Sequence, residues 1–158
     1  MEFEIADPIR GSFDRIDDGH TSTVLCYLGY NSEFETSYFV AAALSPYDDH
    51  FEYSFTVIER RDNAEREMTS GLATLGLFSK ADRIAIRQVV CAATEQLLNW
   101  KKPPRIDRCT ADANLPEKAM LKHLLISEVF KKCGYDVTRC EGWNGQAIWR
   151  ADLVAGKT

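Results

Sequence analysis

Two short turns of this 158-residue chain combine aspartate with histidine, residue types that perform acid–base chemistry and bind metal ions. Residues 17–20 read Asp-Asp-Gly-His, and residues 48–50 read Asp-Asp-His. If both turns lie at one end of a meander of strands, their side chains can converge on a site. The same residue types also form turns beside strands, because aspartate hydrogen-bonds nearby backbone and glycine tolerates positive φ. We prefer this turn-forming interpretation.

Thiols and a further histidine are the other residues that could do chemistry. No two of the cysteines stand in Cys-x-x-Cys spacing, and His123 lies on a different turn of its helix from Cys133, so neither a zinc site nor a nucleophile–base pair is indicated. An odd number of unpaired thiols is typical of the reducing cytosol. We therefore predict no metal site, a cytoplasmic protein and free thiols at Cys26, Cys91, Cys109, Cys133 and Cys140.

Charge and composition limit the classes of partner. The net charge is −5 and the basic residues are dispersed, which disfavours nucleic acid as a partner. No apolar run approaches the roughly 18 residues of a membrane helix. Residues 1–4 are acidic where a secretory signal would be basic, so no export is predicted. The length and the 45% hydrophobic content predict a single domain over residues 1–158.

The first half of the chain is rich in β-branched and aromatic residues, which favour strands. We predict an antiparallel meander of three strands over 21–30, 37–44 and 51–58, with a turn at 45–49.

The segments around this meander are less regular. Residues 3–6 predict a short strand, and 9–16 predict either another strand or a turn of helix. The charged stretch 60–68 predicts a loop or a short exposed helix.

The second half predicts helix, strand, helix, strand, strand, so the chain belongs to the α+β class. Ser79 is a candidate N-cap for the first helix, which ends before Pro103. Its apolar stripe consists of Ile86, Val89, Val90, Ala93, Leu97 and Trp100.

A strand over 105–111 and a second helix follow. This helix is predicted to start at Asn114, with Pro116 in its first turn, and to stop at Gly134. Its predicted apolar stripe consists of Leu121, Leu124, Leu125, Val129, Phe130 and Cys133. Strands over 137–143 and 146–153 then flank a two-residue turn, Asn-Gly at 144–145.

Residues 129–135 read Val-Phe-Lys-Lys-Cys-Gly-Tyr, which resembles the end of the last helix in the GNAT (GCN5-related N-acetyltransferase) family. Residues 102–106 are similar to small GNAT-like proteins of phages and bacteria, which favours a phage or mobile-element origin. The resemblance implies a GNAT-like mixed sheet with helices on its faces. It would also imply acetyl-CoA as a cofactor and acyl transfer to an amine as the reaction.

Two expected features of that family are absent from the sequence. The family binds pyrophosphate at a helix start through a glycine-spaced loop, but Gly71 and Gly76 do not have this spacing. The tyrosine that protonates the leaving thiolate aligns with Phe130, which has no proton to donate. We therefore predict a scaffold without catalytic residues, and acetyl-CoA enters only under the alternative of a divergent acyl-CoA-dependent N-acyltransferase.

Aromatic residues carry the preferred functional hypothesis. Tyr and Trp are enriched at protein interfaces, so we predict a non-catalytic protein-binding module on a GNAT-like scaffold. A small-molecule pocket between diverging central strands is a third hypothesis. The predicted partner-binding residues are Tyr27, Tyr30, Tyr38, Tyr53 and Trp143.

Overall fold

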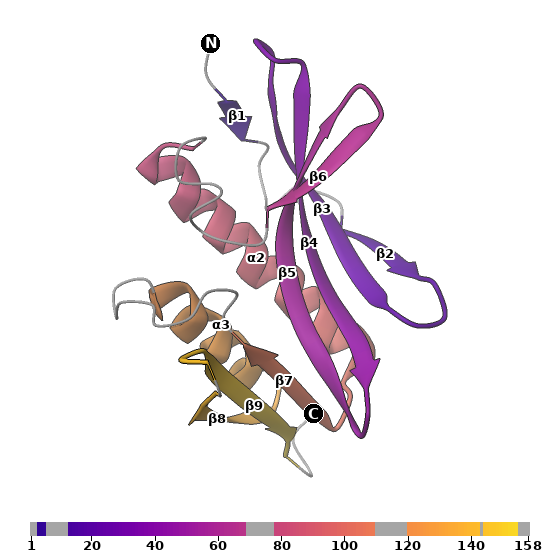
Figure 1. Ribbon diagram of the computed structural model, residues 1–158, viewed down its shortest axis with the longest axis vertical. Coiled ribbons are helices and arrows are strands. Elements are labelled where there is room, and N and C mark those ends of the chain that lie inside the picture. The colour runs from indigo at the N-terminus through magenta and orange to yellow at the C-terminus, as the bar shows by residue number, and fades with distance from the viewer. Residues whose placement is uncertain (1–2, 6–12, 69–77, 110–119, 143, 155–158) are drawn as a thin grey trace.

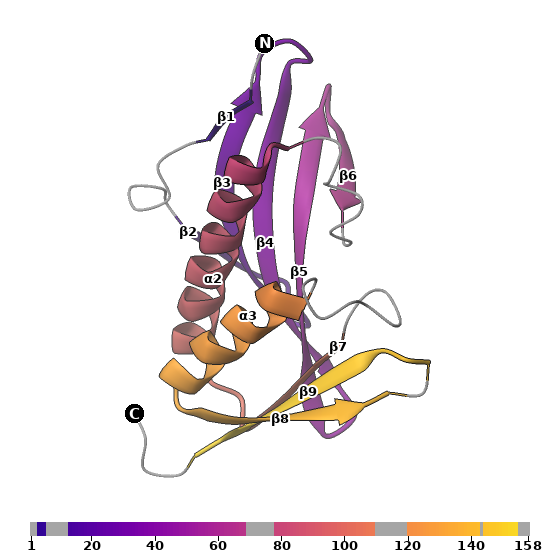
Figure 2. The ribbon, with the colours of Figure 1, turned by 90° about the vertical axis from the view of Figure 1, so that its left-hand side faces the viewer.

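The computed structural model describes residues 3–5, 13–68, 78–109, 120–142 and 144–154. In these residues one mixed sheet of nine strands carries two helices, α2 (Lys80–Lys101) and α3 (Leu121–Lys132), on the same face (Figures 1 and 2). The strands are β1 (Phe3–Ile5), β2 (Phe13–Asp17), β3 (Ser22–Asn31), β4 (Thr36–Tyr47), β5 (His50–Arg61), β6 (Ala64–Met68), β7 (Arg105–Cys109), β8 (Tyr135–Glu141) and β9 (Ala147–Leu153).

The strand order is β1-β3-β4-β5-β7-β9-β8, with β2 also pairing with β3 and β6 with β5. Every described pair is antiparallel except β5 with β7, which are joined through α2. The α+β class, the antiparallel meander and the order of elements in the second half are therefore confirmed.

The meander strands are longer than the sequence predicted. Tyr47 pairs directly with His50, so the turn predicted over 45–49 shrinks to Asp48-Asp49, and Asp48 adopts a positive φ of 55°. Pro46 lies within β4 opposite Phe51.

The prediction of a loop or helix over 60–68 was wrong. This stretch forms a hairpin in which Arg61 pairs with Ala64. The two residues between them, Asp62 and Asn63, have positive φ values of 50° and 67°, which is the type I′ geometry that matches strand twist. Asp and Asn tolerate this conformation, so the residues that read as polar loop are the turn of a hairpin.

Helix α2 begins and ends where its capping residues predicted. The Ser79 hydroxyl accepts a hydrogen bond from the Asp82 amide at 3.1 Å, which satisfies one of the free N–H groups of the first turn. Lys102 closes the helix at φ 31°, and Pro103 follows. Its predicted stripe is buried against β3 and β4, with Trp100 at its margin.

Helix α3 ends as predicted, with Gly134 at φ 98°, and Phe130 and Cys133 of its predicted stripe are buried, but the leucines of that stripe are not. The leucines Leu121, Leu124 and Leu125 are exposed by 46%, 51% and 37%. The prediction that they face the core was wrong, because β7 carries a buried arginine whose hydrogen-bonding groups require polar partners on the helix. The residues that α3 buries are His123, Ile126, Ser127 and Phe130. The predicted start, with Asn114 and Pro116, lies outside the described residues.

The closing hairpin is confirmed, but its turn is wider than two residues. The last pair is Glu141 with Ala147, and the Gly142 amide donates to the Gln146 carbonyl at 2.7 Å. Gly145 supplies the positive φ of 74° that this wider turn requires.

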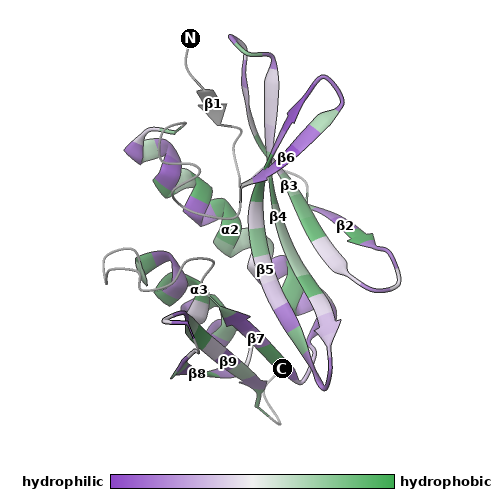
Figure 3. Cartoon of the chain, in the orientation of Figure 1, coloured by the Kyte–Doolittle hydropathy of each residue, from purple (hydrophilic) through white to green (hydrophobic). Residues whose placement is uncertain are grey.

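The core fills the space between the sheet and the two helices, as the apolar residues along α2, β3 and β4 show in Figure 3. A smaller cluster of Met120, Ala147 and Trp149 extends it under the start of α3. Within the described part of the chain, neither helix has an apolar stretch long enough to cross a bilayer.

Candidate functional site

The parallel pair of β5 and β7 forms a narrow seam between the two halves of the sheet. Only two residue pairs join these strands, Phe51 with Ile106 and Glu52 with Asp107. On the same edge of β5, β6 begins to pair at Val57. Between these two stretches, residues 53–56 pair with β4 on one edge, but on the edge that faces β7 they pair with no strand in the described parts of the chain, so β5 and β7 diverge here.

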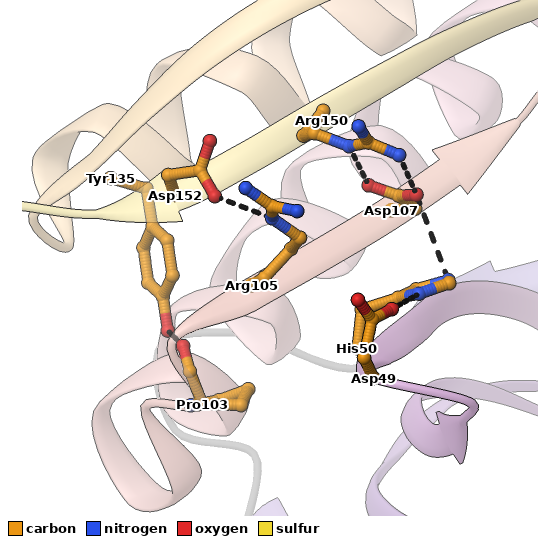
Figure 4. A network of polar contacts seen from close by, with 8 residues as sticks. All are labelled: Asp49, His50, Pro103, Arg105, Asp107, Tyr135, Arg150 and Asp152. Carbon is orange, nitrogen blue, oxygen red and sulfur yellow. Dashed lines mark hydrogen bonds and ion pairs between the residues drawn. The ribbon is translucent and has the colours of Figure 1, made fainter.

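Polar side chains tie the seam together on the face away from the helices (Figure 4). Asp107 on β7 accepts two hydrogen bonds from Arg150 on β9, both at 3.0 Å, and this contact raises the pKa of Arg150. His50 of β5 lies with Nε2 3.6 Å from Asp107 and with Nδ1 3.2 Å from Asp49. The hydrogen bond from His50 lowers the pKa of Asp49. These contacts connect β5 to β7 and β9, a structural role.

On the helix face beyond the seam, Arg108 of β7 is almost fully buried, with 6% exposed. It donates to Nδ1 of His123 at 3.0 Å, to the carbonyl of His123 at 2.7 Å and to the hydroxyl of Ser127 at 2.6 Å. No carboxylate in the described residues bonds to this guanidinium. It lies over the ring of Trp149 at 4.5 Å, a cation–π contact that compensates part of the desolvation.

His123 is fixed as a neutral imidazole in this cluster. It stacks on Trp149 with centroids 4.8 Å apart and planes 13° apart. Because Arg108 can only donate, Nδ1 of His123 accepts and the ring proton must reside on Nε2. Burial, reinforced by the charge of Arg108, lowers the pKa of His123 to about 3, and burial lowers the pKa of Arg108 to about 10. The cluster therefore holds one positive charge at neutral pH.

Phe130 occupies the position that the family resemblance assigns to a proton donor. Its side chain is apolar and buried. Its ring meets Tyr53 and Tyr135 edge-on, with centroids 5.4 Å and 5.8 Å apart. The hydroxyl of Tyr53 is 2.5 Å from that of Thr94, and burial raises its pKa. Proton donation by Phe130 is therefore excluded on chemical grounds.

The outer face of the meander, turned away from both helices (Figure 2), carries apolar residues in adjoining rows. Tyr27, Phe39 and Ile58 are neighbours across β3, β4 and β5, and the next row is Leu25, Ala41 and Thr56. The rings of Tyr27 and Phe39 meet edge-on at 5.5 Å. The guanidinium of Arg60 lies 4.8 Å above Phe39. We call Leu25, Tyr27, Phe39, Ala41, Ile58 and Arg60 the outer strip.

The structure separates the predicted partner-binding residues into two groups. Tyr27 and Tyr30 are exposed by 41% and 39%. Tyr38 and Tyr53 are only 4% and 5% exposed, because they occupy the alternate positions that face the helices, and they cannot belong to a binding face. Burial, with Glu59 nearby, raises the pKa of Tyr38 to about 12. Trp143 lies outside the described residues.

The two aspartate–histidine turns lie at the same end of the meander, where Thr21 and Ser45 are hydrogen-bonded at 3.0 Å, but the contacts of their histidines lead to different elements. Asp17 and Asp18 accept hydrogen bonds from the backbone amides of their own turn, Asp17 from Gly19 and Asp18 from His20 and Thr21, which confirms their turn-forming role. His20 lines a pocket near the end of α2, whereas His50 points to Asp107 across the seam. The five cysteines are unpaired, and the described residues contain no cluster of three or more potential metal ligands.

Sequence reasoning missed Arg108 and Phe39. The alternation of strand residues could have found Arg108, since Ile106 and Arg108 share one face of β7 and Ile106 belongs to the core. Comparison with protein-family models, curated proteins and solved structures found no match to this chain.

Proposed function

We propose that this chain is a non-catalytic protein-binding module on a GNAT-like scaffold, and that its partner docks on the outer strip. One observation carries the proposal: on the sheet face without helices, the rows of Leu25 with Ala41 and of Tyr27 with Phe39 and Ile58 are apolar, where a solvated antiparallel sheet normally has polar residues. Tyr27 is 41% exposed and lies beside Phe39, with Arg60 stacked on that ring.

The chemistry of the outer strip suits a protein partner. Aromatic rings and arginine dominate the energetics of protein interfaces: the rings bury large areas with little loss of side-chain freedom, and the guanidinium stacks on rings and donates several hydrogen bonds. Ala41, at the centre of the strip, is only 7% exposed, so the larger neighbours Tyr27 and Phe39 would supply most of the contact area. Phe34, under the guanidinium of Arg61, is a further aromatic residue with 50% exposure at the β3–β4 turn.

The test compares two tyrosine variants that differ only in location. Tyr27→Asp places a charge in the outer strip, whereas Tyr47→Asp changes a 60% exposed tyrosine at the β4–β5 turn. We expect affinity capture from the native lysate to recover a partner with wild type and Tyr47→Asp, and Tyr27→Asp to bind that purified partner about tenfold more weakly or worse. A partner that binds all three chains equally refutes the outer strip, and recovery of no partner refutes the proposal.

A divergent acyl-CoA-dependent N-acyltransferase is the second candidate, and the divergence of β5 from β7 supports it. Among the described residues, the edge of 53–56 that faces β7 has no partner strand, and an extended chain such as pantetheine could pair there. The buried hydrocarbon of Phe130 counts against catalysis. Calorimetric titration with acetyl-CoA separates the candidates: saturable binding favours the transferase, and no heat at about 1 mM ligand contradicts it.

A further inference from the structure

A pocket of about 260 Å³ lies between the end of α2 and the β2–β3 turn, and no outer-strip residue lines it. Its polar lining comes from Asp17, His20 and Lys101. Its apolar lining comes from Leu44, Pro46, Phe51 and Pro103, at the ends of β4, β5 and α2. The volume lies below the roughly 300–1,000 Å³ of sites for drug-sized molecules, so the pocket fits a smaller ligand.

The carboxylate of Asp17 is already occupied by hydrogen bonds. It accepts from Lys101 Nζ at 2.8 Å, from the Gly19 amide at 2.9 Å and from the Ser22 hydroxyl at 3.2 Å. These contacts, led by Lys101, lower the pKa of Asp17. Asp17 therefore holds the rim of the pocket in place and is a poor acceptor for a further donor.

The groups that remain for a ligand are N–H donors. The ammonium of Lys101 has three hydrogens, and within the described residues it makes one hydrogen-bonded ion pair and lies 4.7 Å from the centre of the Trp100 ring. The imidazole of His20 has no hydrogen-bond partner among the described side chains. The guanidinium of a second cation, Arg15, lies 5.5 Å from the centre of the same Trp100 ring. The available chemistry suits an anion.

The apolar side of the pocket is fixed in position. Leu44 is 1% exposed and belongs to the core. The carbonyl of Pro103 accepts a hydrogen bond of 2.6 Å from the buried Tyr135 hydroxyl (Figure 4). The pocket thus has an apolar wall opposite two N–H donors. This arrangement should bind a molecule with one apolar end and one anionic end more tightly than a molecule that lacks either end.

We propose that this pocket binds a small carboxylic acid with an apolar body, whose carboxylate is held by Lys101 and His20 and whose body packs on Phe51 and Pro46, the apolar lining residues that are not buried. The site is independent of the outer strip, so it can regulate or accompany partner binding without sharing its residues.

Three probes of similar size and different charge test the site on the full chain: sodium benzoate, benzyl alcohol and benzylamine, titrated at pH 7 and followed by amide NMR shifts. We expect benzoate to cause saturable shifts at Gly19, His20, Ser22 and Lys101. Benzyl alcohol should bind at least about fivefold more weakly, because it cannot form a charge-assisted hydrogen bond. Benzylamine should bind most weakly of all.

A matched pair of variants then tests whether the charge of Lys101 binds the carboxylate. Lys101→Met keeps an unbranched stem on Trp100 and should weaken benzoate binding about fivefold to tenfold. Lys131→Met, which removes a lysine paired with Glu128 on α3, should leave it unchanged. Equal affinity for benzoate and benzyl alcohol, preference for benzylamine, or the absence of saturable shifts in wild type would each overturn the proposal, and none of these readings depends on a variant folding.

Discussion

The buried imidazole of His123 makes a specific prediction about acid stability. Its pKa falls from 6.5 to about 3 on folding, so between these values the unfolded chain binds a proton that the folded chain excludes. Stability from this residue is thus complete above pH 6.5 and is lost progressively as the pH falls toward 3.

The magnitude follows from the two pKa values. Linkage gives about 1.4 kcal/mol for each pH unit below 6.5, so the free energy of unfolding should fall by about 2–3 kcal/mol between pH 7.5 and pH 4.5 through His123 alone. That is a large part of the roughly 5–15 kcal/mol that stabilises a typical domain.

The assay is urea unfolding of wild type and His123→Gln at half-unit steps from pH 7.5 to pH 4.5. Glutamine keeps an acceptor for Arg108 but cannot titrate, so the carboxylates that protonate in this range contribute equally to both chains and cancel. At pH 7.5 the variant should be less stable than wild type, because it loses the stacking on Trp149.

The difference should shrink or reverse as the pH falls, by the 2–3 kcal/mol worked out above. Parallel pH profiles for the two chains would refute the reasoning and would mean that folding leaves the pKa of His123 unchanged.

Three further substitutions test the packing, each by urea unfolding at pH 7.5. Tyr53→Phe removes the hydroxyl that bonds Thr94, which itself donates to the Val90 carbonyl, and should cost about 1 kcal/mol; a neutral result would mean that water replaces the bond. Ser79→Ala removes the N-cap of α2 and should cost about 1 kcal/mol, whereas Ser79→Asp should be close to wild type. Phe130→Ala empties a site that is 1% exposed between two tyrosine rings and should cost about 3–5 kcal/mol; a loss below that of Ser79→Ala would contradict the observed packing.

The sequence predicted those elements whose signals are local. Ser79 and Pro103 delimited α2, Gly134 ended α3, and β-branched runs marked the meander, because each of these signals acts through the backbone of its own neighbourhood. The hairpin over 60–68 was missed although its turn is also local, because Asp-Asn is a weaker type I′ signal than Asn-Gly.

The orientation of α3 could not be read from its own residues. The leucine stripe favoured one face, but Arg108, in a different element, selects the face with His123 and Ser127. The Asp17–Lys101 contact, which organises the pocket, likewise joins residues that are distant in sequence and carry no motif. Whether each tyrosine is exposed or buried also depends on which face of the sheet α2 covers. The alternation of strand residues shows which tyrosines share a face, but not which face the helix covers.

The two-pair seam has a consequence for folding. The meander and the β8–β9 hairpin close through short loops, so they can form early, whereas β5 and β7 meet only after the whole α2 crossover has been placed. We therefore expect the C-terminal strands to be the last to dock and the first to exchange their amide hydrogens, opening as a unit while the meander stays protected.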